Sequence, residues 1–486
     1  MVTVLRSLVL DSVSPAALYE KLTDSRPGTF LLESADQDGI WSRYSFIGLS
    51  AWGALSEAEG RAVWLDYGLS ESTAFDGECP PEATSALRRL YKKWNSPAAK
   101  EVPPLTSGLV GFIGWEAVHE LENFASSGTN EQDCPNQTML FVRDLLVIDH
   151  STSLVQLVTT VLADSVDDEA AWDAVQARLT DLESQLNTEI AIRPGRIPND
   201  PKIEVKHRTS KADFLASIET AKRHISDGDI FQVVLSQRFD AELSAKPISL
   251  YRVLRTLNPS PYMYLLSLED SVGEPFSIVG SSPEALVKIT NNRVVTHPIA
   301  GSRPRGKTPD EDSRFAESLL ADEKEKAEHL MLVDLARNDI AKVCAAGSVE
   351  VTEFMNVERF SHIMHLVSSV EGELRADLDP IAVFEATFPA GTLSGAPKPK
   401  ALEIIDRLEP ASRGAYGGVV GYFGFAGDAD LAINIRTAII RNGRVSVQAG
   451  AGIVADSDPE SEYRETETKA GAVLTAIANA NWAANN

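Results

Sequence analysis

The order of short apolar patterns along this chain limits its fold more than any other feature of the sequence. Runs that alternate apolar and polar residues predict strands, among them Thr29–Ser34 and Trp41–Ile47, because successive side chains of a strand point to opposite faces. Predicted strands and helices are mixed along the whole chain without a regular strand–helix–strand repeat. This order favours an α+β fold with antiparallel sheet over a doubly wound parallel sheet.

The same patterns predict the positions of most other segments. Helices are expected at about 82–94, 166–187, 211–226 and 311–345, and a last helix from 458 to about 480. Strands are expected at 140–149, 153–162, 231–239, 277–279, 293–296, 418–425, 431–440 and 445–449. The last helix has the clearest start, because Asp458 is followed by Pro459 and proline is well tolerated in the first turn.

One segment is a candidate linker between domains. Arg193–Pro201 (RPGRIPNDP) contains three prolines and one glycine, which disfavour regular structure. We therefore expect an N-terminal region over residues 1–195 and a second domain over residues 196–486.

Net charge and cysteine content limit which partners the protein is expected to bind and in which compartment of the cell it is expected. The 486 residues include 45 Lys and Arg against 70 Asp and Glu, a net charge of −25, which argues against nucleic acid or an anionic membrane as partner. The three cysteines are too few for a disulfide framework and lack zinc-site spacing. Because no apolar run is long enough for a membrane span or a signal peptide, we expect a soluble protein of the cytoplasm.

Two segments rich in glycine are candidate binding elements. Gly450–Ala455 fits the G-x-G-x-x-A pattern of dinucleotide sites, but no helix is expected to begin within it. We therefore expect a tight turn, whose amide groups could approach an anion. Pro298–Gly306 (PIAGSRPRG) places two arginines between prolines and predicts a rigid basic loop that binds an anion.

Single basic side chains are weaker candidates. Arg436 is expected on the same strand face as Asn434, where it could bind a carboxylate or simply face solvent. His362 and His365 have no third metal ligand nearby, so a catalytic or hydrogen-bonded role is favoured over zinc binding.

Two pairs of acidic residues could bind a metal. Glu325 and Glu328 are three residues apart in one predicted helix, as are Glu462 and Glu465 in the last helix, so each pair shares a helix face. If the two helices met, the four carboxylates would suit Mg²⁺. Solvated helix surfaces of an acidic protein produce the same spacing, so the pattern alone favours a solvated surface over a metal site.

Several long motifs together resemble the chorismate-utilising enzymes, most closely the large subunits of anthranilate synthase. The motifs are Gly280–Glu284 (GSSPE), Pro298–Gly306, Glu328–Asp339 (EHLMLVDLARND), Phe388–Lys398 (FPAGTLSGAPK), Gly417–Tyr422 (GGVVGY) and Gln448–Gly452 (QAGAG). The likeness covers about 205–480 nearly continuously. It implies paired antiparallel sheets flanked by helices, with the site in the C-terminal part.

The resemblance implies a role for each motif residue. The implied ligands of Mg²⁺ are Glu328 and Glu465, with Glu325 and Glu462 beside them. The implied proton-transfer groups are Glu284 and His365. The implied contacts to chorismate are Gly301, Ser302, Tyr416, Arg436, Gly450, Ala451 and Gly452. Position 302 usually holds Thr in the family, so Ser302 predicts a small change in substrate fit, while the motif cations Lys398 and Lys469 receive no assigned role.

The implied reaction converts chorismate and ammonia into anthranilate and pyruvate for tryptophan biosynthesis. Hydroxide is a poor leaving group, so a metal ion on the ring carboxylate and an acid near the 4-hydroxyl would both lower the barrier. Ammonia adds at the ring 2-position as the hydroxyl leaves, and the loss of pyruvate makes the ring aromatic.

Two positions distinguish this chain from other members of the family. Relatives that add water carry a lysine base at the position of Gln232, and aminodeoxychorismate synthases carry a nucleophilic lysine at the position of Ala300. The absence of both lysines favours direct amination by ammonia. The cysteines Cys79, Cys134 and Cys344 do not lie in a glycine-rich nucleophile turn, so a separate glutamine amidotransferase partner is expected to supply the ammonia.

A regulatory site is also implied. Ser34, with Pro261, Tyr262 and Met263, is similar to the tryptophan-binding residues of the family, which implies feedback inhibition by tryptophan. Two alternatives remain open: an aminodeoxychorismate synthase component I, and a non-catalytic sensor of chorismate or tryptophan. The presence of Glu284 and His365 argues against the sensor, because a protein that only binds needs no proton-transfer groups.

Overall fold

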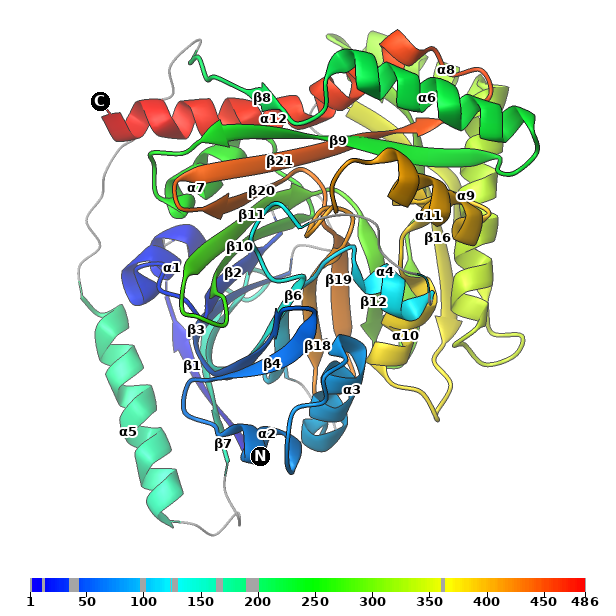
Figure 1. The fold of residues 1–486 in the computed structure, drawn as a ribbon. Helices are drawn as coiled ribbons and strands as arrows, with labels where there is room; N and C mark the ends of the chain where they lie inside the picture. The colour runs from blue at the N-terminus through cyan, green and yellow to red at the C-terminus, as the bar shows by residue number, and fades with distance from the viewer. Residues whose placement is uncertain are drawn as a thin grey trace.

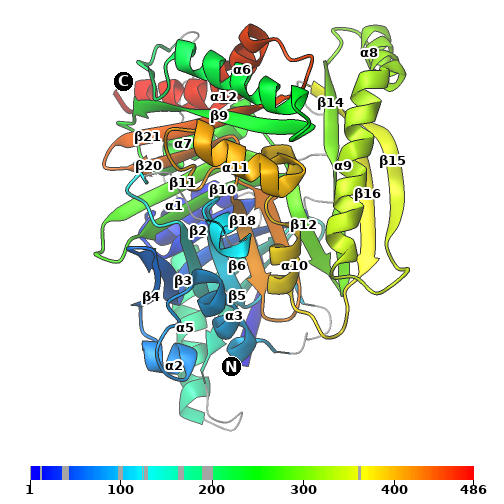
Figure 2. The ribbon, with the colours of Figure 1, turned by 45° about the vertical axis from the view of Figure 1, so that its right-hand side comes forward.

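Strands form the interior of the protein and helices surround them (Figures 1 and 2). The computed structural model describes residues 2–10, 14–34, 43–96, 102–122, 124, 130–162, 169–188, 201–359 and 363–485. Within these ranges no helix is both long enough and apolar enough to cross a membrane.

The strands of the described residues form one continuous network of 21 members, and all their pairings are antiparallel. Their bounds are β1 Val2–Val9, β2 Thr29–Glu33, β3 Tyr44–Ala58, β4 Arg61–Asp66, β5 Gly108–Ile113, β6 Gln137–Asp149, β7 Leu154–Val161, β8 Lys206–His207, β9 Gln232–Glu242, β10 Tyr262–Glu269, β11 Pro275–Ser282, β12 Ala285–Thr290, β13 Arg293–Thr296, β14 Ile299–Pro304, β15 Glu350–Arg359, β16 Ile363–Glu373, β17 Gly395–Ala396, β18 Val419–Gly424, β19 Ala429–Ile433, β20 Thr437–Arg441 and β21 Arg444–Ile453.

The helices connect these strands at irregular intervals. Their bounds are α1 Pro15–Thr23, α2 Glu71–Phe75, α3 Ala83–Trp94, α4 Ala117–Leu121, α5 Glu169–Leu186, α6 Lys211–Ser226, α7 Pro247–Leu257, α8 Pro309–Ala321, α9 Glu323–Ala341, α10 Pro380–Thr387, the 3₁₀ turn η1 Gly391–Leu393, α11 Lys398–Leu408 and α12 Pro459–Asn485. The predicted α+β class with antiparallel sheet is confirmed, and the predicted helices near 82–94, 166–187 and 211–226 correspond to α3, α5 and α6.

Strands from the two ends of the chain are interleaved in the sheet. The register pairs give the order β9–β21–β20–β11–β10–β2–β3–β6–β5–β18–β19–β12–β13–β16. The early strands β2, β3, β6 and β5 therefore lie between late strands on both sides. The predicted boundary at 195/196 and most of the predicted linker fall outside the described residues, so the division into two domains stays a prediction.

The sheet curls so that distant strands face each other across a core. Phe112 of β5 and Phe276 of β11 lie five strands apart in the order above, yet their ring centroids are 6.2 Å apart. Phe46 of β3 and Tyr422 of β18 are in similar contact, at 5.8 Å. These aromatic contacts bury large apolar areas between the two halves of the sheet, which is the paired arrangement that the family resemblance predicts.

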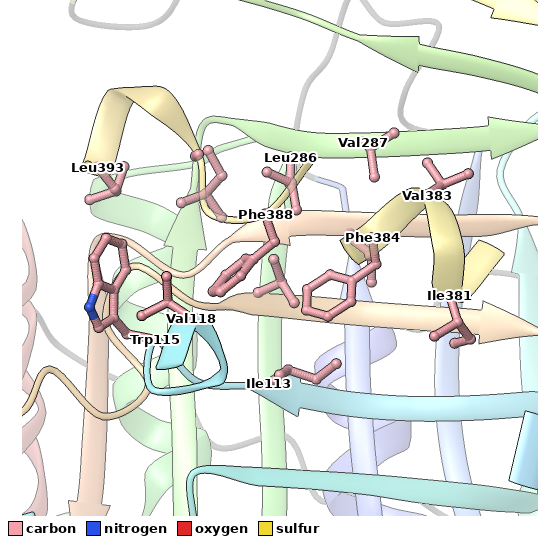
Figure 3. Close-up of a cluster of buried hydrophobic side chains, with 14 of the residues drawn as sticks. Ile113, Trp115, Val118, Leu286, Val287, Ile381, Val383, Phe384, Phe388 and Leu393 are labelled. Atoms are coloured by element: carbon pink, nitrogen blue, oxygen red, sulfur yellow. The ribbon is translucent and has the colours of Figure 1, made fainter. Parts of the chain in front are cut away.

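Two further cores lie between the sheet and its helices. One joins α1, α5, α7 and α12 to the strands, and the other joins α3, α4, α6, α9, α10 and α11 to them. Figure 3 shows part of the second core, where Trp115, Phe384 and Phe388 pack against Leu286 and Leu393. This core fixes the segments that follow α10, including η1, against the sheet.

The predicted helix over 311–345 is wrong as a single element. It is two helices, α8 and α9, with a break at Asp322. Asp322 has an extended backbone, and its side chain accepts hydrogen bonds from the backbone N–H groups of Lys324 and Glu325, so it caps the second helix. Cys344 consequently lies beyond the helix, in an isolated bridge with Leu374.

Three other segment predictions are also corrected. The strand predicted over 431–440 is broken into β19 and β20, with Arg436 between them at φ 50°. Gly450–Gly452 do not form a turn but continue β21, which pairs with β9 along this stretch. The segment 298–306 is not a loop, because most of it is strand β14, paired with β16. In each case pairing with a distant strand decided the local structure.

Candidate active site

Most of the predicted site residues line one cavity of about 460 Å³. We call it the glutamate cavity, because five glutamates contribute to its wall. The predicted residues that line it are Glu284, Gly301, Ser302, Glu325, Glu328, His365, Tyr416, Arg436, Gly450, Gly452, Glu462 and Glu465, together with Gln232, Ala300 and Lys469. Ala451 lies in the hydrophobic core instead, since alternate residues of β21 point to opposite faces. His362 lies outside the described residues.

Glu284 is a buried acid at the junction of β11 and β12. Its carboxylate accepts a hydrogen bond of 3.0 Å from the hydroxyl of Thr392, which follows α10 in the 3₁₀ turn η1. Burial raises the pKa of Glu284 to about 7, although the Thr392 hydroxyl and the charges of Lys469 and Arg436 act in the opposite direction. Near neutral pH a large fraction of this side chain is therefore protonated, and it can donate a proton within the cavity.

His365 is held in one tautomer by the backbone of β14. Its Nδ1 lies 2.8 Å from the carbonyl oxygen of Gly301, and because a carbonyl only accepts, Nδ1 carries the proton. Burial, together with the charges of Arg436 and Lys469, lowers the pKa of His365 against the opposing effect of that carbonyl. The neutral ring can therefore accept a proton only at Nε2.

Gly301 forms a bulge where β14 pairs with β16. The register shifts between Ala300 and Ser302, and Gly301 has φ 68°, a conformation that favours glycine. A Cβ atom at this position would lie 3.0 Å from Oε2 of Glu325. The bulge therefore brings the backbone of β14 close to the acidic side chains of α9.

Arg436 is placed by strained backbone rather than by a strand. Its left-handed conformation interrupts the sheet between β19 and β20, which is costly for a residue with a side chain and is common at functional sites. Arg436 lines the glutamate cavity. Tyr416 also lines it, and the tyrosine hydroxyl lies 2.8 Å from where a Cβ of Gly450 would stand. The lack of a side chain at Gly450 thus leaves the tyrosine hydroxyl room in the cavity.

The four helix carboxylates come from α9 and α12, which face the same cavity. Burial raises the pKa values of Glu328 and Glu462, and neighbouring carboxylates contribute to both shifts. Arg303 pairs with Glu325 at 3.2 Å and Lys469 with Glu465 at 2.8 Å. Lys324 also lies 4.0 Å from Glu328, yet neighbouring carboxylates still raise the pKa values of Glu328 and Glu462. A cluster of carboxylates of this kind fits a hard divalent cation such as Mg²⁺. In the described part of the chain, however, no three metal-ligating side chains converge on one point.

The two arginines of the segment 298–306 do not face an anion. Arg303 donates to Asp322 at 2.7 Å and to Glu325. Arg305 pairs with Asp312 at 2.7 Å. Both therefore serve to fix β14 against α8 and α9, and the predicted basic anion loop is wrong.

A buried ion pair supports the wall of the glutamate cavity from outside. Arg413 is fully buried and forms two hydrogen bonds, of 2.7 and 2.8 Å, to the carboxylate of Glu409. It also donates to the carbonyl oxygens of Leu393 at 2.8 Å and Val234 at 2.9 Å, two residues that line the cavity. Its guanidinium lies 4.2 Å from the ring centroid of Trp115. One side chain thus joins α11, β9 and η1.

The predicted regulatory residues lie on two paired strands. Ser34 directly follows β2, and Met263 of β10 is opposite Glu33 in the register. The Ser34 hydroxyl is buried and has no hydrogen-bond partner among the described residues, and Met263 is buried. Pro261 and Tyr262 lie at the start of β10, so the structure brings these four residues into one region.

A larger hollow of about 980 Å³ lies elsewhere and is a poorer candidate. Several of its charged residues already pair with one another or with neighbours. Glu131 pairs with Arg208 and Arg238, and Arg441 pairs with Asp270. The glutamate cavity is smaller, but it combines a buried acid, a buried base and a cluster of carboxylates.

The profile of the chorismate binding enzymes matches residues 56–475. The chain belongs to this family. This chorismate binding enzyme is 48% identical over 480 residues to anthranilate synthase component 1 of Arthrobacter globiformis. The alignment covers 97% of this chain and 89% of that protein. The chain is 45% identical to the protein of the same name from Mycolicibacterium smegmatis, covering 99% of this chain and 91% of the relative.

Solved structures agree with this assignment. The crystal structure of anthranilate synthase component I from Streptococcus pneumoniae TIGR4 has a TM-score of 0.76 and 34% identity, covering 90% of this chain and 94% of that one. The menaquinone-specific isochorismate synthase of Escherichia coli has a TM-score of 0.72 at 20% identity, covering 98% of this chain and 94% of that one, and it shares the fold. The predicted family, and the prediction of an enzyme related to anthranilate synthase component 1, are confirmed.

Sequence reasoning missed three residues that shape the site. Thr392 lies within the Phe388–Lys398 motif, so the sequence indicated that this segment belongs to the site. It did not indicate that the Thr392 hydroxyl donates a hydrogen bond to Glu284. Glu409 and Arg413 have only the i, i+4 spacing of a helix-surface ion pair, which gave no reason to expect their burial.

Replacing Arg413 with methionine is expected to destabilise the fold strongly. The variant Arg413→Met leaves the buried Glu409 carboxylate without its partner and removes the donors to Leu393 and Val234, so the free energy of unfolding should fall by about 3–5 kcal/mol. Denaturant titration measures the change. Arg407→Met, on the exposed side of α11, is the control and should cost less than about 1 kcal/mol. Equal losses in the two variants would contradict the assigned role.

Proposed function

We propose that this chain is the large subunit of an anthranilate synthase, which converts chorismate and ammonia into anthranilate and pyruvate. The observation that carries the proposal is that Gln232 and Ala300 line the same cavity as Glu284. Neither side chain can act as a base or a nucleophile at neutral pH, while the cavity retains a protonatable acid. The names and identities of the relatives support the same activity.

The protein's own groups explain how the first step could proceed. Tyr416 and Arg436 would bind a carboxylate of chorismate, and the backbone of Gly450 and Gly452 would contact the substrate with Gly301 and Ser302 around the ring; their position in the lining of one cavity supports these roles. Glu284 donates its proton to the 4-hydroxyl as the carbon–oxygen bond breaks, so that water leaves instead of hydroxide. Ammonia forms the new bond at the ring 2-position as this water leaves. His365 would then accept the proton of ring carbon 2 at Nε2 as the ring becomes aromatic, and return a proton to the methylene carbon of the enolpyruvyl group, which leaves as pyruvate.

Glu328 and Glu465 would hold Mg²⁺, with Glu325 and Glu462 beside them. When bound, the ion would polarise the ring carboxylate of chorismate and draw electron density from the ring. The residues fit this role because burial and the charges of neighbouring carboxylates disfavour the ionised forms of Glu328 and Glu462. A divalent cation relieves that repulsion.

Ammonia would come from a separate glutamine amidotransferase subunit. Burial raises the pKa of the thiols of Cys79, Cys134 and Cys344 to about 12, 11 and 11. Such thiols are poor nucleophiles, which supports the assignment of glutamine hydrolysis to another chain. A location in the cytoplasm stays a prediction from the low cysteine content.

Tryptophan would inhibit the enzyme by binding near Ser34, Pro261, Tyr262 and Met263. The pairing of β2 with β10, and of β10 with β11, connects this region to the strand that ends just before Glu284. Inhibition requires that tryptophan bind an inactive arrangement better than the active one. A shift of β10 relative to β11 would move the end of β11, and with it Glu284, when tryptophan binds.

The activity is tested by supplying chorismate, ammonium salt and Mg²⁺ to the purified chain. We expect pyruvate and fluorescent anthranilate in equal amounts, and little product when glutamine replaces the ammonium salt. Glu328→Ala and Glu465→Ala should each lower turnover by about 100-fold or more, as should a chelator, while the exposed Glu323→Ala should not. An aminodeoxychorismate synthase would release no pyruvate, and a sensor would consume no chorismate.

The role of Glu284 predicts a definite pH dependence. Because the acid must be protonated to donate, kcat/KM should fall about tenfold per pH unit above its pKa of about 7. Glu284→Gln should lower kcat by about 10²- to 10⁴-fold and abolish this dependence. Thr392→Val removes a hydrogen bond that favours the carboxylate, so the fall should begin at higher pH in that variant. A wild-type profile that is flat from pH 6 to 9 would exclude Glu284 as the acid.

The regulatory site is tested with Ser34→Phe, which adds a ring where the serine side chain is buried. We expect the concentration of tryptophan for half-inhibition to rise at least about tenfold, because the binding region is filled, with little change in KM for chorismate. Ser34→Ala is the matched control and should remain inhibited. Full sensitivity of the phenylalanine variant to tryptophan would show that the site lies elsewhere.

A further inference from the structure

A second, smaller cavity adjoins the glutamate cavity. Its volume is about 60 Å³, and it shares the lining residues Glu284, Leu332 and Thr392 with the larger one. We call it the Asp339 cavity, because Asp339 of α9 also lines it. The two cavities therefore meet at the buried acid and at the threonine that hydrogen-bonds to it.

Most of the surface of the Asp339 cavity is apolar, but the cavity has polar lining residues and room for water. The polar lining residues are Glu284, Thr296, His297, Asp339, Thr387 and Thr392, although the Thr387 hydroxyl already donates to the carbonyl groups of Val383 and Phe384. A buried water needs about 10–15 Å³ and two or more polar partners, so there is room for more than one. His297 also lines the cavity, and burial lowers its pKa to about 4, so the ring is neutral near pH 7.

Asp339 binds one exposed and one buried lysine, and the exposed one connects this cavity to solvent. Its Oδ2 accepts a hydrogen bond of 2.8 Å from Lys398, a buried side chain that also donates to the carbonyl of Thr387. Its Oδ1 accepts a bond of 3.0 Å from Lys342, whose side chain is 52% exposed. A series of groups that can carry protons thus runs from the surface to the cavity.

Under the proposed function, on which this inference rests, the reaction requires a series of proton-carrying groups that reaches Glu284. When Glu284 protonates the leaving 4-hydroxyl, the carbon–oxygen bond breaks, water forms and Glu284 becomes a carboxylate. The ammonium group formed at the ring 2-position gives its extra proton to solvent and not to Glu284. The acid is buried, and bound product fills the glutamate cavity, so the acid must regain a proton from elsewhere or wait for release.

We propose that water in the Asp339 cavity returns a proton to Glu284 while product is still bound. The water gives a proton to the Glu284 carboxylate and takes one from Asp339, which has received it from the ammonium group of Lys342 or Lys398. The exposed lysine then regains a proton from solvent, so one proton enters for each one consumed. This gives the motif cation Lys398 a role as a proton-relay residue.

The test is to fill the Asp339 cavity without touching the glutamate cavity. Ala336 lines only the smaller cavity, so Ala336→Leu should displace its water. At pH 6.5 we expect the first turnover to keep the wild-type rate, because Glu284 starts protonated, and the steady-state rate to fall about tenfold. A small weak acid that is largely protonated at this pH, such as imidazolium, should restore the rate. Ala411→Leu, which fills a different cavity of about 20 Å³, is the control and should change neither rate.

Three results would overturn the relay. They are an unchanged steady-state rate in Ala336→Leu, a first turnover slowed as much as the later ones, and a loss that small acids do not restore. A high-resolution crystal structure of the wild-type protein provides a test that needs no variant, since it should show ordered water joining Glu284 to Asp339, and a dry cavity would refute the proposal. Wild-type protein that releases no pyruvate would instead refute the proposed function, and the relay with it.

Discussion

The buried pair of Arg413 and Glu409 is the interaction on which the site most depends. A buried ion pair is stable only when every donor and acceptor is satisfied. Arg413 meets that condition by bonding to the carbonyl groups of Leu393 and Val234, while Glu409 also accepts from the backbone and hydroxyl of Ser236. The requirement to satisfy these charges locks β9, η1 and α11 into one arrangement, so the wall of the glutamate cavity is set before any substrate arrives.

Burial, together with two cations, determines which groups of the cavity are protonated. Arg436 and Lys469 lie close enough to Glu284 and His365 to lower both pKa values. For the acid, burial outweighs these cations, whereas for the histidine burial and the cations act together. The same cavity can therefore hold a protonated acid and a neutral base at one pH, which is the combination that acid–base catalysis needs.

The sequence predicted the fold class and most elements because their patterns are local. α6 and α12 have clear capping signals at Ser210 and Asp458. One failure was local, because Asp322 divides a helical pattern by capping the second helix. Others came where distant contacts override local preference, and Gly450–Gly452 are extended because β9 lies beside them. The site residues were predicted through family motifs, whereas Thr392, Glu409 and Arg413 needed the three-dimensional contacts, since burial of an ion pair cannot be deduced from spacing.

The interleaving of early and late strands has a consequence for synthesis on the ribosome. β2 and β5 are made long before β10 and β18, the strands that complete their hydrogen bonding. Until then both carry unpaired edges with apolar side chains, which readily associate with other chains. Sheet completion must therefore await most of the polypeptide, and the nascent chain is exposed to aggregation for much of translation. Dependence on chaperones during expression is thus a consequence of strand order.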